Sequence, residues 1–462
     1  MKPTTALVPP IRTVVATAVT AAIVTLASGG AHAAFFQLAE NSPAGLGNAF
    51  AGGAAVAEDA STVWYNPAGM TRLSGSQMVA GGYLILPSLK FNKTSANHAP
   101  LLGGGAISGG NGGDAGESAI VPNFYYTRPV SDRLSFGLGV NVPFGLATDY
   151  DDDWVGRYHA NRSEIMTINV NPALAYKVNE AFSVGGGINY QKLDATLTQR
   201  VDYGSICLLA GNPPGCGGAT PGANDGDAEV KADDDAWGFN VGALWRLSDT
   251  MRLGVAYRSK MKYGLEGSFD VTAPTAVAAG AGNAVGGLVD SGARANVTLP
   301  ETISVSVYHA LSPVWSVMAD ITRTRWSRIP ELRIDFDSSQ ADSVTTLDLE
   351  DANRYSVGAS YAPGGGWRYR FGVALDKTPT PNEVVRTPRL PDEDRLWLAL
   401  GAGYKQSDTL SFDVSYVYIK VDDAAINKTA GAPGSENFLR GSLVGSYEAN
   451  TQILGAQLNW KF

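Results

Sequence analysis

Two cysteines and four histidines are the residues of this sequence best suited to covalent or metal chemistry. Cys207 and Cys216 stand close together in a stretch rich in glycine and proline. A zinc site would need further cysteine or histidine ligands at short spacing, and no such residue lies near this pair. Because an exported protein can form disulfides, the sequence favours a disulfide that staples a loop, with two free thiols as the alternative.

The histidines do not form a pattern that would serve catalysis. His32, His98, His159 and His309 are scattered along the chain, and no Gly-x-Ser-x-Gly motif supplies an activated serine. The sequence also lacks a Walker phosphate-binding motif, a dinucleotide-binding motif and a cluster of metal ligands. We therefore expect neither enzymatic activity nor a cofactor.

The start of the chain has the three parts of a secretory signal peptide. Lys2 and Arg12 give it a positive beginning, Val14–Leu26 is an uncharged apolar run, and Ala31-His32-Ala33 offers small residues for cleavage. A membrane anchor is the alternative, but the run is shorter than the ~20 apolar residues of a spanning helix. We predict that residues 1–33 are removed after export.

Charge and hydropathy narrow the class of protein further. The formal net charge is −9, and loss of Lys2 and Arg12 takes it to −11. Since nucleic-acid affinity depends on neutralising phosphates, such an acidic chain is not expected to bind nucleic acid. Beyond the signal, the most apolar stretch is Ala273–Val289, which is mostly alanine and glycine and is too weakly hydrophobic for a transmembrane helix.

Two-residue alternation is the repeated pattern of the remaining chain. In Trp367–Leu375 and Leu410–Tyr418, large apolar residues alternate with small, polar or charged ones, as on the two faces of a strand. A soluble sandwich would also alternate. A membrane barrel is favoured because the apolar faces are almost uninterrupted, aromatic residues stand at strand ends, and Leu454–Phe462 is an alternating strand that ends the chain. We predict an all-β protein, with residues 77–462 as one transmembrane antiparallel β-barrel.

Two other parts of the chain are not expected to be strands. Gly204–Asp235 and Thr272–Ala295 are predicted as long loops on the outer side, opposite the short turns of such barrels. Residues 34–76 lack alternation and are too few for a separate domain and too apolar for a disordered tail. We predict that they form a hatch that plugs the lumen.

Several short motifs, in this order, resemble the long-chain fatty-acid outer-membrane transporters of the FadL type. The resemblance covers the whole mature chain. The motifs are Ala34-Phe35-Phe36-Gln37-Leu38, Gly45-Leu46-Gly47-Asn48-Ala49-Phe50-Ala51-Gly52, Glu58-Asp59-Ala60, Asn66-Pro67-Ala68, Val121-Pro122-Asn123, Tyr257-Arg258-Ser259, Leu299-Pro300-Glu301, Trp326-Ser327 and Leu390-Pro391-Asp392-Glu393-Asp394-Arg395-Leu396-Trp397.

The resemblance implies a barrel of fourteen strands closed by the hatch. Cargo would land in a hydrophobic groove built by the loops at 206–219 and 276–289, pass to a lumenal pocket beside the N-terminus, and leave sideways at a kinked third strand. That strand would contain Pro122 and Asn123, and Asn66, Pro67 and Ala68 would lie against the kink.

The same resemblance implies the residues of the pocket. Phe36 would line it, Arg333 would hold the carboxylate of the cargo, and Arg200 is a second candidate for that task. Arginine suits the task because its planar fork can bind a carboxylate through two hydrogen bonds. In the alternative interpretation, these arginines only pair with acids of the barrel.

We therefore predict a transporter in the outer membrane of a Gram-negative bacterium, acting by facilitated diffusion. The resemblance implies long-chain fatty acids as the cargo, and each buried methylene would contribute ~0.8 kcal/mol to their binding without any chemistry. Aromatic or aliphatic hydrocarbons are the alternative cargo, and a lipid hydrolase or an adhesive barrel would be the alternative function. Outer-membrane lipids are the expected surroundings of a monomer, with no energy-coupling protein.

Overall fold

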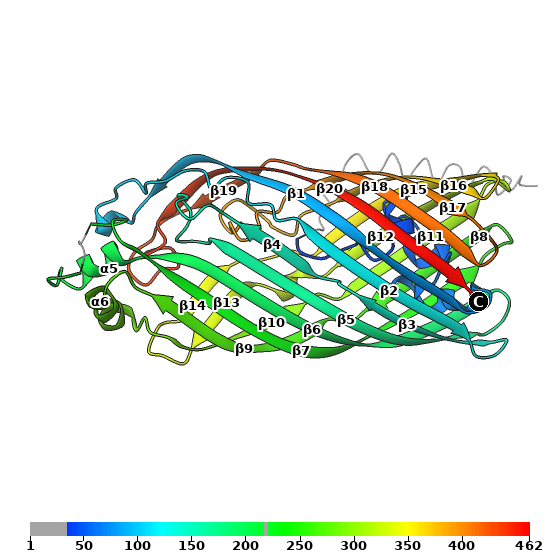
Figure 1. The fold of residues 1–462 in the computed structure, drawn as a ribbon, viewed down its shortest axis with the longest axis horizontal. Helices are drawn as coiled ribbons and strands as arrows, with labels where there is room; N and C mark the ends of the chain where they lie inside the picture. Colours follow the sequence, from blue (N-terminus) through cyan, green and yellow to red (C-terminus); the bar gives the residue numbers. More distant parts are fainter. Residues whose placement is uncertain (1–34, 217–219) are drawn as a thin grey trace, which may run out of the picture. The chain divides into compact units, whose positions relative to one another are not determined.

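A computed structural model describes residues 35–216 and 220–462 of the chain. The predicted signal peptide, residues 1–33, lies outside the described residues. Within the described part, no helix has both the length and the apolar character needed to cross a membrane. Strands make up most of the structure (Figure 1).

The strands form one closed antiparallel ring. β1 (Gln77–Asn97) pairs with β20 (Ser442–Lys461) along almost its whole length, from Gln77 opposite Lys461 to Asn97 opposite Ser442. β1 also pairs with β2 (Ala119–Pro129) on its other edge, so the last strand closes the ring onto the first. The ring has 14 strand positions, which confirms the predicted fold class.

The described residues form twenty labelled strands, because several of the 14 positions are interrupted and carry two labels. β14 is a short strand that pairs only with β13. The other strands are β3 (Leu134–Asn141), β4 (Gly145–Asp149), β5 (Arg162–Lys177), β6 (Phe182–Asp202), β7 (Asp225–Arg246), β8 (Met251–Arg258), β9 (Met261–Thr272), β10 (Ser291–Leu299), β11 (Thr302–Ala310), β12 (Trp315–Thr324), β13 (Glu331–Phe336), β14 (Ser343–Thr346), β15 (Ala352–Gly364), β16 (Trp367–Asp376), β17 (Arg395–Lys405), β18 (Leu410–Val421) and β19 (Ala424–Lys428).

The helices are short. They are α2 (Pro43–Leu46), α3 (Gly53–Val56), α4 (Thr62–Tyr65), α5 (Tyr203–Leu209) and α6 (Ala276–Gly286), with the 3₁₀ turns η1 (Pro67–Arg72), η2 (Pro100–Leu102) and η3 (Trp326–Arg328). α5 and α6 lie at the end of the barrel opposite the C-terminus (Figure 1). The predicted outer loops thus contain these two helices, but residues 225–235, expected in a loop, belong to β7.

In the half of the barrel nearer to the C-terminus, the wall has apolar residues outside and polar residues inside, the reverse of a soluble protein. On β18, Val414 is 58 % exposed whereas its neighbours Asp413 and Ser415 are 7 % and 5 % exposed. Arg258 and Asp320 likewise face the interior, where they line a cavity. An apolar outer surface suits contact with lipid chains, and the polar residues fill the interior, as in membrane barrels.

The third strand position is broken. β3 pairs with both β2 and β5, but its pairing with β2 ends at Phe124 opposite Val140. After Val142–Phe144 the position continues as β4, which pairs with β5. Residues 119–123 of β2 therefore pair with β1 only, which leaves a window in the backbone hydrogen bonding of the described wall.

Residues 35–76 precede the first strand and are called the N-terminal segment below. The segment makes close contacts with strands from all around the ring: α2 contacts β17, β18 and β20, α3 contacts β8, β11 and β12, and η1 contacts β3, β5, β6 and β7. Its first helix, α2, starts at a local cap: the Ser42 side chain accepts a hydrogen bond from the Gly45 amide, and Pro43 takes the first helical position.

Candidate functional site

An apolar cavity lies in the half of the barrel nearer to α5 and α6; it is called the outer cavity below. About 110 Å³ of it is open to the centres of water-sized molecules. Only Thr345, Thr387 and Arg389 among its lining residues carry polar side chains. The apolar lining residues are Phe35, Phe36, Leu146, Ile165, Leu193, Ala195, Leu197, Val230, Ala232, Leu265, Ala295, Val297, Leu299, Ile329, Leu332, Ile334, Leu347 and Leu390.

Strand geometry explains this lining. Leu193, Ala195 and Leu197 are two residues apart on β6, so they face the same side of the wall. Val230 and Ala232 on the neighbouring β7 have the same spacing. Such alternation along β6, β7, β10 and β13 gives a cavity wall without polar groups, which suits an apolar ligand.

Aromatic rings close the inner side of the outer cavity. Phe36 lies 5.3 Å from Phe35, 5.2 Å from Trp326 and 5.8 Å from Phe144, measured between ring centroids. Trp326 is fully buried. The structure therefore brings Phe36 to a cavity of the kind that the resemblance implied.

Two charged residues of the motif at 390–397, Asp392 and Arg395, hold the backbone of Phe35. The Phe35 amide donates to Asp392 Oδ2 at 3.1 Å, and Arg395 Nη2 donates to the Phe35 carbonyl at 3.1 Å. Arg395 and Asp392 also form an ion pair at 2.5 Å. Phe35 has a φ of 62°, a left-handed conformation that costs free energy in a non-glycine residue. The motif thus fixes the aromatic floor of the cavity.

The next residues of the N-terminal segment pair with the broken third strand. The Leu38 amide donates to the Pro143 carbonyl at 2.9 Å, and the Gly145 amide donates to the Phe36 carbonyl at 3.0 Å. Gln37 forms an antiparallel bridge with Phe144. Residues 36–38 therefore act as a short extra strand at the interruption between β3 and β4.

The gate residues lie elsewhere than the resemblance implied. Pro122 and Asn123 are in β2, the second strand, because the third position is β3 and β4. They nevertheless border the window, and the Asn123 side chain is 5 % exposed. Asn66 donates from Nδ2 to the carbonyls of Ala54 and Ala243, at 2.7 and 3.0 Å.

The Asn66-Pro67-Ala68 turn is therefore attached to β7. A Cβ atom on Gly242 of β7 would lie 2.0 Å from Asn66 Oδ1, so only glycine leaves room for this turn. The same holds at Gly185 of β6, where a Cβ would lie 2.5 Å from the Ala68 amide nitrogen. The motif packs on β6 and β7 rather than against the interruption, which corrects the expected placement.

Arg389 is the one charged residue that lines the outer cavity. Its guanidinium donates to Ser163 Oγ at 3.0 Å, to the Thr198 carbonyl at 3.2 Å and to Gln199 Oε1 at 3.3 Å. Among the described residues, no carboxylate lies within ion-pair distance of it. Burial, and next the neighbouring guanidinium of Arg440, lower the pKa of Arg389 to about 9. A buried cation held only by neutral groups is able to receive an anion.

The two arginines predicted from the sequence are placed differently. Arg333 of β13 lies between Leu332 and Ile334, which line the outer cavity, so its side chain is on the other face. It pairs with Glu331 and Asp342, each at 2.8 Å. Arg200 of β6 pairs with Asp227 of β7. Neither arginine lines the outer cavity, and both have the acidic partners that the alternative interpretation named.

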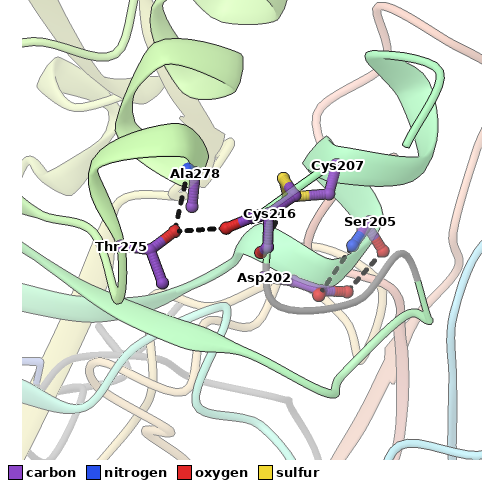
Figure 2. The surroundings of a disulfide bond; sticks show 7 residues. Asp202, Ser205, Cys207, Cys216, Thr275 and Ala278 are labelled. Atoms are coloured by element: carbon purple, nitrogen blue, oxygen red, sulfur yellow. Dashed lines mark hydrogen bonds between the residues drawn. A yellow bond between two sulfur atoms is a disulfide. The ribbon is translucent and has the colours of Figure 1, made fainter. Parts of the chain in front are cut away.

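A second apolar group is formed by α5 and α6 at the outer end. Cys207 and Cys216 form a disulfide with 6.1 Å between the Cα atoms, the pairing that the sequence favoured (Figure 2). The disulfide is buried against Ala278 and Ala281 of α6. Thr275, the N-cap of α6, donates from its side chain to the Gly215 carbonyl at 3.3 Å and accepts from the Ala278 amide at 3.1 Å (Figure 2).

This helix pair also exposes apolar side chains. Leu208 and Leu209 of α5 are each 40 % exposed, and Val285 of α6 is 40 % exposed. A small extension of the outer cavity reaches Leu288, just after α6, and shares Arg389 and five other residues with it. An apolar surface at the outer end is thus followed by an apolar cavity below it.

Comparison with known proteins gives relatives along almost the whole chain. A profile of the family described as outer membrane protein transport protein (OMPP1/FadL/TodX) matches residues 24–462. The chain is 31 % identical to outer membrane protein P1 of Haemophilus influenzae over 459 residues, 95 % of this chain and 97 % of that protein. It is 30 % identical to the long-chain fatty acid transport protein of Escherichia coli O6:H1 over 427 residues, 89 % and 92 % of the two chains. The crystal structure of a FadL homologue from Pseudomonas aeruginosa is similar with a TM-score of 0.82 and 28 % identity, covering 93 % of this chain and all of that one.

Proposed function

Because the chain belongs to the OMPP1/FadL/TodX family of outer membrane transport proteins, we propose that its cargo is a long-chain fatty acid. Members of this family are outer-membrane channels for hydrophobic compounds in Gram-negative bacteria and not enzymes, and this protein is such a channel. The finer assignment of cargo and route is our proposal.

The observation that carries the proposal is the single unpaired guanidinium of Arg389 in an otherwise apolar cavity. A fatty acid has one carboxylate and one long apolar chain, which match these two features. The carboxylate would bind the guanidinium through charge-assisted hydrogen bonds, and the chain would contact the leucine, valine and alanine side chains. We propose Arg389 as the anchor in place of Arg333 and Arg200.

The route would begin at the exposed apolar side chains of α5 and α6 and continue into the outer cavity. From there the cargo would leave sideways through the window beside β2, where Pro122 and Asn123 lie on its border. The N-terminal segment would act as the hatch, since residues 36–38 are hydrogen-bonded at the interruption of the third strand. Burial of methylenes and the contact with Arg389 would drive binding, so the monomer would need no energy-coupling partner.

Hydrocarbons are the second candidate cargo. The lining of the outer cavity suits a hydrocarbon as well as it suits the acyl chain of a fatty acid, because all but three of its residues have apolar side chains. An uncharged ligand would, however, leave the buried guanidinium of Arg389 without an anion. The two cargo classes therefore differ in their dependence on this one residue.

The test is the affinity of purified Arg389→Gln and Arg389→Ala protein for oleate and for an alkane of similar length. We expect oleate binding to weaken by about 1.5–3 kcal/mol, roughly 10- to 150-fold, the range for a hydrogen bond to a charged group. Alkane binding should stay within about twofold, since apolar burial is unchanged.

Two controls make the result specific. Arg389→Lys should keep part of the affinity, because the charge remains while the planar fork is lost. Arg333→Ala should change neither affinity. Unchanged oleate binding in Arg389→Gln would refute the anchor, and a loss in Arg333→Ala would restore the residue chosen from the sequence.

A further inference from the structure

Hydrophilic cavities lie between the N-terminal segment and the barrel wall. The first inner cavity touches Gln37–Ala39 and offers about 120 Å³ to the centres of water-sized molecules. The second inner cavity, with about 50 Å³, shares the lining residues Phe50, Gly53 and Tyr65 with the first. The two are therefore neighbours on either side of these residues of the segment.

The third inner cavity continues this series to the end of the barrel. It offers about 340 Å³ and shares Glu58 and Asp59 with the second. The short turns at Gly364–Gly366 and Ser407–Thr409 contribute to its lining, together with Lys461 near the C-terminus. In membrane barrels the short turns face the periplasm, so the series begins at the periplasmic end and reaches the underside of residues 37–39.

Two buried polar groups without a partner in the described part of the chain stand in the lining of the first inner cavity. Asn240 is 2 % exposed and Arg354 is 7 % exposed, yet Asn240 Nδ2 and Arg354 Nε have no hydrogen-bond partner among the described residues. Each buried polar group without a partner costs about 1–3 kcal/mol. Both residues line the cavity, so water there can satisfy them.

The second inner cavity is the smallest of the three. Glu58 and Asp59 are its only charged lining residues. Glu58 pairs with Arg368 and, at 2.7 Å, with Arg370, and Asp59 accepts a hydrogen bond from Gln457 Nε2 at 2.8 Å. The arginines balance the charge of Glu58, whereas Asp59 has no ion-pair partner among the described residues, so the uncompensated negative charge of Asp59 favours cations over anions here.

We propose that the three inner cavities form a hydrophilic vestibule that admits water and small monovalent cations from the periplasmic end, with Glu58 and Asp59 as its cation-selective constriction. The vestibule stops at the N-terminal segment, above which the outer cavity is apolar. An acyl chain would gain less by entering it than by entering the outer cavity, because it would displace water from the polar groups of its walls. This proposal does not depend on which hydrophobic compound the outer cavity binds.

Single introduced thiols can test it cleanly. The sequence has only two cysteines, and both are in the disulfide, so one introduced cysteine is the only free thiol. Ser304→Cys places a thiol in the first inner cavity, and Ala195→Cys places one in the outer cavity as the matched control. Silver ion is a suitable probe, since it is a small hydrophilic monovalent cation that binds thiols.

We expect silver ion to react with Ser304→Cys at least about tenfold faster than with Ala195→Cys in the folded barrel, and both to react alike after unfolding. Adding Glu58→Gln should slow the Ser304→Cys reaction about fivefold, the effect of one unit charge a few ångströms away in a wet site. Adding Glu266→Gln, a change at an exposed acid of the outer wall, should leave the rate unchanged.

Two results would overturn the proposal. Equal rates at Ser304→Cys and Ala195→Cys would mean that the inner cavities are no more hydrated than the outer one. A fast reaction at Ser304→Cys that is insensitive to Glu58→Gln would mean that cations do not pass the constriction.

Discussion

The outer and inner halves of the lumen are built from the same strands but have opposite linings. On β7, Val230 and Ala232 face the outer cavity, whereas Asn240 faces the first inner cavity. The outward side chains of β7 show the reverse order. They are charged beside the outer cavity, at Asp227 and Lys231, and aromatic beside the first inner cavity, at Trp237 and Phe239; Trp237 is 68 % exposed. The same two-residue alternation can therefore place apolar groups either inside or outside, according to what surrounds each part of the barrel.

The two halves also differ in how the chain is fastened. At the outer end, the disulfide between Cys207 and Cys216 holds α5 against α6. At the inner end, the N-terminal segment is held by ion pairs such as that of Glu58 with Arg370. A covalent link responds to reductant, whereas ion pairs respond to pH and salt. The two ends can therefore be loosened independently.

Loss of the disulfide should have the largest effect. In the chain-entropy account, a link closing about ten residues contributes about 2.5–3 kcal/mol. We expect Cys207→Ser with Cys216→Ser to lower the free energy of local unfolding of α5 by this amount, measured by hydrogen exchange of residues 203–216. Exchange in the N-terminal segment should stay unchanged. Equal protection of α5 with and without the disulfide would show that packing on α6 alone orders the loop.

The fold could be predicted because alternation is a local property of the sequence. Trp367–Leu375 and Leu410–Tyr418 read as strands from their own residues, and β16 and β18 include them. Residues 225–235 were expected to belong to the long loop that begins at Gly204, but they form the start of β7, whose charged face is the outer one. An alternation that places charges on the outer face was therefore not identified as a strand.

The site was harder to predict because its contacts join distant parts of the chain. Arg389 reaches Thr198 across 191 positions, and Phe35 meets Asp392 across 357. Phe36 was named only through the resemblance of its motif, and it lines the outer cavity. Arg333 was chosen by its place in the sequence, but a shift of one residue along a strand changes the face.

A polar substitution in the outer cavity should have the next largest effect. Leu197→Asn keeps the branched shape and the number of heavy atoms of the side chain, but cargo must then remove water from a buried amide, which costs about 2 kcal/mol. We expect oleate and alkane binding both to weaken roughly 30-fold in equilibrium titrations. The matched change in the first inner cavity, Thr302→Val, should leave both affinities within about twofold. A loss in Thr302→Val instead would place cargo in the inner half.

The smallest predicted effect is a contrast between two acids of the N-terminal segment, Glu40 and Glu58. Burial alone would raise the pKa of Glu58, but Arg368 and Arg370 outweigh it and lower that pKa from 4.5 to about 2. For Glu40, which is 4 % exposed, burial raises the pKa above 4.5, and the nearby Arg354 and Arg395 offset this only in part. Ionised Glu58 therefore stabilises the folded segment, and ionised Glu40 destabilises it.

The sign of each effect sets its pH dependence. The contribution of Glu58 is complete above pH 4.5 and is lost as the pH falls through about 2. Glu58→Gln should therefore weaken the attachment of residues 35–76 at pH 7 by about 1–2 kcal/mol, after allowance for solvent screening at a partly exposed side chain. At pH 3 more than half of this difference should be gone.

Glu40→Gln should instead strengthen the attachment of residues 35–76 at pH 7. It should have little effect at pH 3, because Glu40 is then protonated in both the folded and the unfolded state. Hydrogen exchange of the segment, corrected for intrinsic rates, measures both variants. The same sign of change in both variants at pH 7 would show that the arginines do not distinguish the two carboxylates.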